Sequence, residues 1–173
     1  MKFTISAADH RGKIDNVSWS ISKDMLLIQG NGLMRNFSDL NLPQWCEYRN
    51  DVKSVVVGKG VTSIGNFAFA GFEMMTTIYM PNTVKYIGDG AFFRVGLRNV
   101  EIPVTVLKIG KGAFFGVHLR SLEIPETVIK IGECAFWGSE QAVTEKVRYA
   151  ETPMMVYSSG FREMEKMSVA LGI

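Results

Sequence analysis

A glycine-rich stretch at residues 106–117, VLKIGKGAFFGV, has the residue types of a phosphate-binding loop. An apolar run leads into Gly110, Gly112 and Gly116, and glycine-rich backbone after a strand cradles phosphate groups through its N–H groups. A dinucleotide-binding unit also needs about 30 residues, including a complete crossover helix. Here the next expected strand begins about nine residues after Gly110, and the Gly-Lys-Gly at residues 58–60 lacks the spacing of a Walker loop. The spacing therefore argues against a nucleotide site.

Glu101 and Glu123 offer a second chemistry, because paired carboxylates can act as general acid and general base. We expect them on adjacent strands about 4.8 Å apart, open to solvent on a shallow sheet. The two histidines, His10 and His118, fall in no catalytic or metal-binding motif. We therefore expect no enzyme, no catalytic residue, no cofactor and no metal. An enzyme acting on a glycan or a peptide would need a cleft between residues 1–51 and the rest of the chain.

The composition of the 173-residue chain is ordinary for a globular protein, with 47% hydrophobic and 21% charged residues. Its net charge of +2 and scattered basic residues predict no nucleic-acid partner. No stretch approaches the ~20 apolar residues of a membrane span, so we expect no membrane insertion. Residues 1–15 lack the apolar segment of a secretory signal, which predicts a cytoplasmic protein if Met1 is the native start. Cys46 and Cys134 are expected to be buried free thiols.

Four similar rows follow one another along the chain, starting at Val52, Met75, Leu97 and Leu119. A period of 22 to 23 residues is typical of leucine-rich repeats. An extra residue around 73–74 accounts for the longer first step. Two pairs define the register: Ile-Gly at 64/65, 87/88, 109/110 and 131/132, and Ala-Phe at 68/69, 91/92, 113/114 and 135/136.

Each row predicts one coil of a solenoid. The opening apolar-x-x-apolar-x-apolar pattern predicts a short strand with one inward face, which the following Pro ends. The Val-x-x-Ile that comes next predicts another inward pair, Gly permits a turn, and Ala-Phe predicts a short helical turn. Phe69, Phe92, Phe114 and Phe136 are expected to stack as a buried column, each adding on the order of 2 kcal/mol. The expected fold class is α/β, a short leucine-rich-repeat solenoid of four 22–23-residue coils with a parallel β-sheet on one face.

The N-terminal end of such a stack needs a cap, because an open end exposes strand edges and apolar core. Residues 1–51 are expected to form a small β-rich capping module. Apolar residues alternate at 3–5, 17–21 and 26–28, which predicts half-buried strands. Pro43 is expected at the start of a short helix that faces the first repeat.

The C-terminal end is expected to carry a second cap. Residues 52–140 form the repeats, and residues 141–173 follow them. The pattern predicts a fifth strand at 146–149 and an amphipathic helix at 159–171. We expect this helix to cover Phe136.

The pattern P-x-x-V-x-x-I-G-x-x-A-F in these rows resembles the BspA-like leucine-rich repeat family of bacterial surface proteins. Residues 16–34 and residues 42–69 resemble the small module that often precedes these repeats together with the first repeat, so the similarity covers roughly residues 13–150. The family's frequent Cys after the Ala-Phe-x-Gly turn is replaced by Phe72, Val95, Val117 and Ser139. The resemblance implies an extracellular or cell-surface protein that contacts a protein or peptide partner, for example a host extracellular protein.

The outward positions of the expected strands form a candidate partner-binding face. Tyr79 beside Val56, flanked by acids, is the kind of patch that anchors a partner, although a face of roughly 300 Å² suits only an extended peptide or a weak contact. We expect a non-catalytic protein-recognition or adhesion module that binds through this face and the adjoining N-terminal module. The alternative is an intracellular or structural scaffold or spacer without a dedicated ligand site, and the oligomeric state is open. The candidate residues are Val56, Thr77, Tyr79, Asn99, Glu101, Ser121, Glu123, Lys146 and Arg148.

Overall fold

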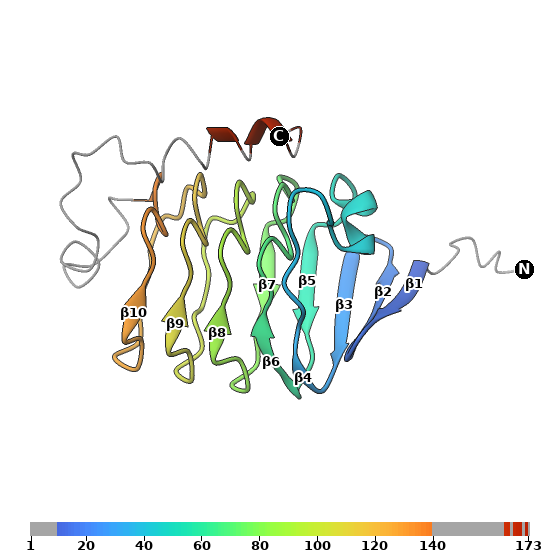
Figure 1. Cartoon of the computed structure of the whole chain (residues 1–173), viewed down its shortest axis with the longest axis horizontal. Helices are drawn as coiled ribbons and strands as arrows, with labels where there is room; N and C mark the ends of the chain where they lie inside the picture. Colours follow the sequence, from blue (N-terminus) through green and yellow to red (C-terminus); the bar gives the residue numbers. More distant parts are fainter. Residues whose placement is uncertain (1–9, 140–164, 167, 171, 173) are drawn as a thin grey trace, which may run out of the picture.

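Short strands alternating with tight turns build an elongated stack of coils (Figure 1). The computed structural model describes residues 10–139, 165, 166, 168–170 and 172. The elements are β1 His10–Ile14, β2 Val17–Ser22, β3 Met25–Gly30, β4 Gly32–Leu33, the 3-10 helix η1 Gln44–Tyr48, β5 Ser54–Val57, β6 Val61–Ile64, β7 Thr77–Tyr79, β8 Tyr86–Ile87, β9 Lys108–Ile109 and β10 Lys130–Ile131.

The first sheet joins the N-terminal strands to the strands of the repeats. Its strand order is β1-β2-β3-β5-β7; β1, β2 and β3 pair antiparallel, whereas β3, β5 and β7 pair parallel. Val17, Trp19 and Ile21 of β2 are buried and alternate with polar residues, as the sequence predicts. The N-terminal strands therefore continue the sheet of the repeats and share its core.

In the third and fourth rows the expected strands are almost absent. They are reduced to one bridge between Asn99 and Ser121, next to a 2.8 Å hydrogen bond from the Arg120 N–H to the Arg98 carbonyl. The outward positions of β5 and β7 include Val56, Thr77 and Tyr79, whereas the equivalent outward positions here include Asn99, Glu101 and Glu123. Val, Thr and Tyr are enriched in strands and Asn and Glu are depleted, which accounts for the weaker pairing.

A second sheet, absent from the prediction of a sheet on one face, lies on the other side of the core. The four Val-x-x-Ile segments, together with β4 of the N-terminal region, form it as parallel strands in the order β10-β9-β8-β6-β4. The sequence pattern predicted which side chains of these segments point inward, but it did not predict that the segments pair as strands. The core therefore lies between two sheets, with Val55 and Val57 from one side and Ile64 and Ile87 from the other.

The sequence predicts a short helical turn at each Ala-Phe unit, and the structure has a turn there that is closed by bonds between residues three apart, such as Ala113 to the Gly110 carbonyl (3.3 Å) and Phe115 to the Gly112 carbonyl (3.1 Å). We call their side of the stack the turn edge, made of residues 66–72, 89–95, 111–117 and 133–139. Further hydrogen bonds join the turns of neighbouring coils: Phe69 donates to the Ala91 carbonyl (2.9 Å), Phe92 to Ala113 (2.8 Å) and Phe114 to Ala135 (2.7 Å). The turn edge is thus a third ladder between the coils.

The predicted column of phenylalanine rings is confirmed. Ring centroids of Phe69, Phe92, Phe114 and Phe136 are 5.6, 4.9 and 5.3 Å apart along the column, with planes within 19° of parallel. Trp45 of η1 extends the column and donates its indole N–H to the Ala68 carbonyl at 2.7 Å. A second column, Phe93, Phe115 and Trp137, was not foreseen from the sequence.

Side-chain oxygens form a further ladder just after the Ile-Gly pairs. Asn36 Oδ1 accepts the N–H of Asn66 at 3.0 Å, Asn66 Oδ1 accepts that of Asp89 at 2.9 Å, and Asp89 Oδ1 accepts that of Lys111 at 2.8 Å. Glu133 holds the next position, and its carboxylate lies 4.0 Å from Lys111 Nζ.

The two caps are only partly within the described residues. Pro43 directly precedes η1, one residue before the expected position. The strands expected at 3–5 and 146–149 lie outside the described residues. The described helical residues 165–166 and 168–170 lie along the turn edge (Figure 1), where Glu165 lines a hollow together with Phe115 and Trp137. The other residues of the expected helix at 159–171 lie outside the described residues.

Phe114→Ala is expected to lower the free energy of unfolding by roughly 3–5 kcal/mol, because the substitution leaves a cavity inside the column. Urea denaturation monitored by circular dichroism measures the change. Ile129→Ala, at an 84% exposed position, is the control and should change stability little. Equal midpoints for the two variants would contradict the stacked column.

Gly110→Ala is expected to cost roughly 1–3 kcal/mol through overpacking. A Cβ at Gly110 would lie 2.6 Å from the Asp89 backbone nitrogen of the preceding coil, a contact that backbone cannot easily relieve. Gly58→Ala is the matched control, because its Cβ would meet its nearest atom at 3.1 Å. Denaturation midpoints that rank the two variants in the opposite order would refute the close-approach explanation.

Candidate functional site

We call the outer surface of the first sheet, and of the rows that continue it, the strand face. Most of the predicted site residues lie on this face. Register pairs Val56 with Tyr79, and the bridge pairs Asn99 with Ser121. Thr77, Tyr79, Asn99, Glu101, Ser121 and Glu123 are exposed and Val56 is half-buried, whereas Lys146 and Arg148 lie outside the described residues.

Tyr79 is the most prominent side chain of this face. Its side chain is 55% exposed, whereas the side chain of the adjacent residue, Ile78, packs against the core. A shallow hollow of about 100 Å³ separates it from Glu101 and Pro103 of the next coil. An aromatic ring beside a carboxylate can take an apolar side chain together with a cation or a hydrogen-bond donor.

Two apolar residues of β3 enlarge this face, and the sequence reasoning missed them. Met25 is opposite Ser54 and Leu27 is opposite Val56, so both lie on the outer surface. We call Met25, Leu27, Val56 and Tyr79 the apolar patch. The inward alternation of Leu26 and Ile28 already implied that Met25 and Leu27 point outward, but the sequence did not show that β3 lies beside β5.

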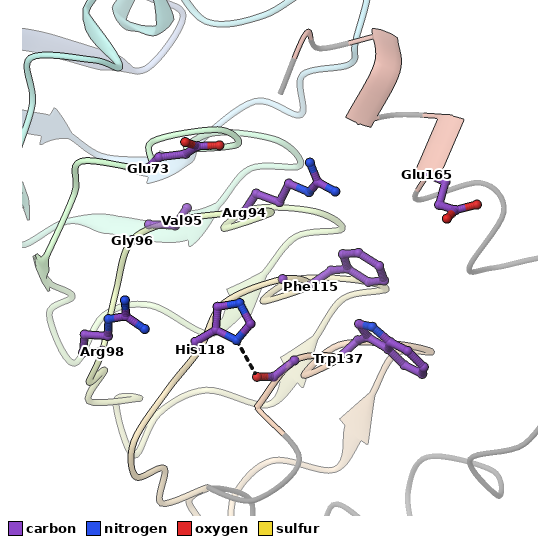
Figure 2. A pocket seen from close by; sticks show the side chains of 11 residues that line it. Glu73, Arg94, Val95, Gly96, Arg98, Phe115, His118, Trp137 and Glu165 are labelled. Atoms are coloured by element: carbon purple, nitrogen blue, oxygen red, sulfur yellow. Dashed lines mark hydrogen bonds between the residues drawn. The ribbon is translucent and has the colours of Figure 1, made fainter.

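A groove on the turn edge has a volume of about 580 Å³ (Figure 2). Phe115 and Trp137 line it together with charged residues from several coils. His118 Nδ1 donates to the Gly138 carbonyl at 3.1 Å, because a carbonyl oxygen only accepts. The Arg94 guanidinium lies 5.9 Å from the centroid of the Phe93 ring. The charged lining consists of Glu73, Arg94, Arg98, His118 and Glu165.

This groove lacks the arrangement of a catalytic site. The Gly138 carbonyl orients the His118 imidazole, but the described lining of the groove holds no Ser, Thr or Cys whose hydroxyl or thiol this imidazole could activate. His10 is in β1, where its Nδ1 lies 2.9 Å from the Tyr48 hydroxyl, so the two histidines serve different parts of the fold. No group of three or more His, Cys, Asp and Glu side chains in the described part is placed to hold a metal ion.

The backbone N–H groups of residues 110–112 all donate hydrogen bonds to neighbouring coils. Gly110 donates to the Ile87 carbonyl at 2.8 Å, Lys111 to Asp89 Oδ1 at 2.8 Å and Gly112 to the Glu133 carbonyl at 2.9 Å. These amides cannot cradle a phosphate without breaking the stack. The structure thus supports the sequence argument against a nucleotide site.

Cys46 is not placed to act as a nucleophile. Burial raises the pKa of its thiol from 9.0 to about 12, and the nearby Arg49 lowers it only in part. The thiol is therefore protonated at physiological pH, and thiolate is the reactive form. Cys134 is only half-buried, so the expectation of a buried thiol holds for Cys46 alone.

Parallel ladders that join equivalent positions of successive rows, such as Tyr86, Lys108 and Lys130, define a leucine-rich-repeat-type solenoid. Residues 42–167 match, in six copies, the family described as "BspA type Leucine rich repeat region". The chain belongs to this family. The six copies extend beyond the four rows on both sides.

Solved structures that are similar to the chain include two bacterial leucine-rich repeat proteins. A leucine-rich repeat protein from Eubacterium ventriosum ATCC 27560 is 30% identical over 76% of this chain, with a TM-score of 0.71, and this chain spans only 36% of it. A leucine-rich repeat protein of T. pallidum is 19% identical over 74% of this chain and 67% of its own length, with a TM-score of 0.55, which supports the fold alone. No protein with a curated description matches the sequence.

The family defines a general function. Leucine-rich repeats are in general protein-interaction modules and are typically not enzymes, and the BspA type is often associated with the cell surface. In the part of the chain that the structure describes, no helix has the length and apolar character that crossing a bilayer requires.

In a Cys134→Ser chain, iodoacetamide at pH 8 should label Cys46 about a hundredfold more slowly in the native state than in urea, because the buried thiol stays protonated. Folding raises the pKa of the Cys46 thiol. The contribution of this thiol to the free energy of unfolding is therefore fully present below pH 9 and is lost as the pH rises through about 12. Mass spectrometry after timed quenching gives the rates. Equal labelling in both conditions would contradict the burial of Cys46.

Proposed function

We propose that the chain is a non-catalytic recognition module that binds a protein or peptide segment through the strand face and the adjoining N-terminal strands. The apolar patch carries this proposal. Its four side chains come from β3, β5 and β7, lie next to one another by strand register, and point away from the core. A sheet whose outer surface contacts only water would not need a cluster of apolar side chains on that surface.

The patch has the properties of an anchor. Tyr79 and Met25 are both exposed, and Leu27 and Val56 fill the space between them. Tyr supplies a large contact area at low conformational cost, and Met adapts to different partner shapes. Polar neighbours such as Ser54 and Thr77 surround the patch, as the rim of an interface does.

The size of the face favours a peptide over a large globular partner. From β1 to the coil of Glu123 there are seven strand positions, which span ~29 Å at ~4.8 Å each. With about 14 Å along the strands, the face covers roughly 400 Å², whereas a standard interface takes ~800 Å² per partner. A globular partner would bind here through one protruding segment.

We further propose that the protein works at the cell surface in adhesion, with a partner outside the cell that makes it. The association of the BspA-type family with the cell surface supports this location. A host or neighbouring extracellular protein would offer such a segment. The rival function, a scaffold without a ligand site, leaves the exposed apolar patch without a role.

Tyr79→Ala combined with Glu101→Ala is expected to weaken partner capture at least about tenfold, because it removes the central contact of an interface. Thermal stability should stay close to wild type, since both side chains are exposed. Extracellular proteins captured by immobilised wild-type chain are compared with those captured by the variant. Tyr86→Ala, which removes a 43% exposed tyrosine of the second sheet, is the control.

Equal capture of the same proteins by the wild type and the double variant would exclude the strand face as the binding surface. Capture of nothing except further copies of the chain would favour the scaffold function.

A further inference from the structure

Strand register places five outward side chains in one row across the first sheet. Arg11 is opposite Ser20, and Ser20 is opposite Leu27. Leu27 is in turn opposite Val56, and Val56 is opposite Tyr79. The row thus passes from the N-terminal edge strand to the repeats without leaving the outer surface.

This row begins with positive charge. Arg11 and its neighbour Lys13 are both exposed and point outward from β1, the edge strand among the described residues. Within the described residues neither forms an ion pair, because the three ion pairs found there involve other residues. Ser18, Ser20 and Ser22 of β2 separate this basic edge from the apolar patch.

The opposite end of the row is acidic. Glu101 borders the hollow beside Tyr79, and Glu123 is its equivalent one coil further, in the register set by the bridge of Asn99 and Ser121. Both carboxylates are exposed, and no Lys or Arg of the described residues forms an ion pair with them. Arg98 of the same coil lines the turn-edge groove, so it lies beside the row and not in it.

The two charged ends act independently of each other. They lie ~29 Å apart by strand spacing, whereas charges are screened over ~8 Å at physiological ionic strength. A ligand therefore gains from each end only where it carries the countercharge at that place. Net charge alone does not determine the fit, because the chain carries only +2.

We infer that the strand face selects an extended peptide segment of about nine residues with separated charges. Acidic residues lie over Arg11 and Lys13, apolar residues over the apolar patch, and basic residues over Glu101 and Glu123. The inference rests on the proposed function and adds to it that residues outside the repeats determine specificity.

The contacts of such a segment are made by side chains. Its direction crosses the strands, so its backbone does not add a strand to the sheet, and binding depends on the apolar centre and on the two charged ends. Exposed charges at the rim of an interface mainly raise the association rate and are sensitive to salt. Binding should therefore weaken as the salt concentration rises.

A display library of random peptides of about twelve residues tests this inference, since that length exceeds the span of the row. Selection uses the full chain as bait, with counter-selection on the Tyr79→Ala, Glu101→Ala variant. The recovered peptides should carry an acidic cluster and a basic cluster separated by apolar residues. Their affinity, measured by fluorescence anisotropy, should fall about tenfold or more on Arg11→Glu combined with Lys13→Glu.

The matched control is Lys108→Glu combined with Lys130→Glu, which changes the net charge equally on the second sheet. It should leave the affinity within about twofold of wild type. Peptides that require Tyr79 but bind the Arg11, Lys13 variant as tightly as wild type would overturn the inference and leave the proposed function standing. A selection in which no peptide distinguishes wild type from the Tyr79, Glu101 variant would overturn both.

Discussion

Hydrogen bonds between the main chains of successive coils set the spacing on which the rest of the structure depends. They occur on both flanks and along the turn edge, for example from Gly88 to Ile64 (2.9 Å) and from Phe92 to Ala113 (2.8 Å). Neighbouring coils are thereby held at strand distance, ~4.8 Å, around most of their circumference. Phenylalanine rings stack well at this distance, whereas a Cβ at Gly88, Gly110 or Gly132 would collide with the preceding coil.

The same spacing makes the outer surface a grid. Equivalent side chains of successive coils become neighbours in rows. The surface that a partner contacts is therefore determined by several coils together and not by the side chain of one coil. The apolar patch arises in this way from strands that are far apart in sequence, since Leu27 and Tyr79 are 52 residues apart and are separated only by Val56 in space. Recognition by this protein is thus a property of the stack and not of one coil.

The sequence predicted the inward half of the fold well, because the repeat places Val, Ile, Ala and Phe in columns that only stacked coils can bury together. It did not predict which strands pair. Whether β3 lies beside β5 depends on contacts that produce no periodic pattern in the sequence. The reason for the glycine column was also different from the expected one. Gly110 is required by close approach, whereas the left-handed backbone occurs two residues later, at Phe67, Gly90, Gly112 and Cys134. Of the candidate site, the repeat columns and a contribution from the N-terminal module were expected from the sequence, whereas Met25 and Leu27 of β3 were not.

The ladder of side-chain oxygens gives the stack a direction. Asn36, Asn66 and Asp89 each accept an N–H from the next coil, whereas the Lys111 side chain carries no acceptor and its Nζ lies 4.0 Å from the Glu133 carboxylate. Between the last two described coils the Ser139 hydroxyl adds other bonds, because it donates to the Val117 carbonyl and accepts the Leu119 N–H at 3.0 Å. In a linear array whose stability is a sum over nearest-neighbour interfaces, each such bond supports the one interface that it crosses. Loss of one bond should therefore speed the exchange of amide protons with solvent most at that interface, and not uniformly along the stack.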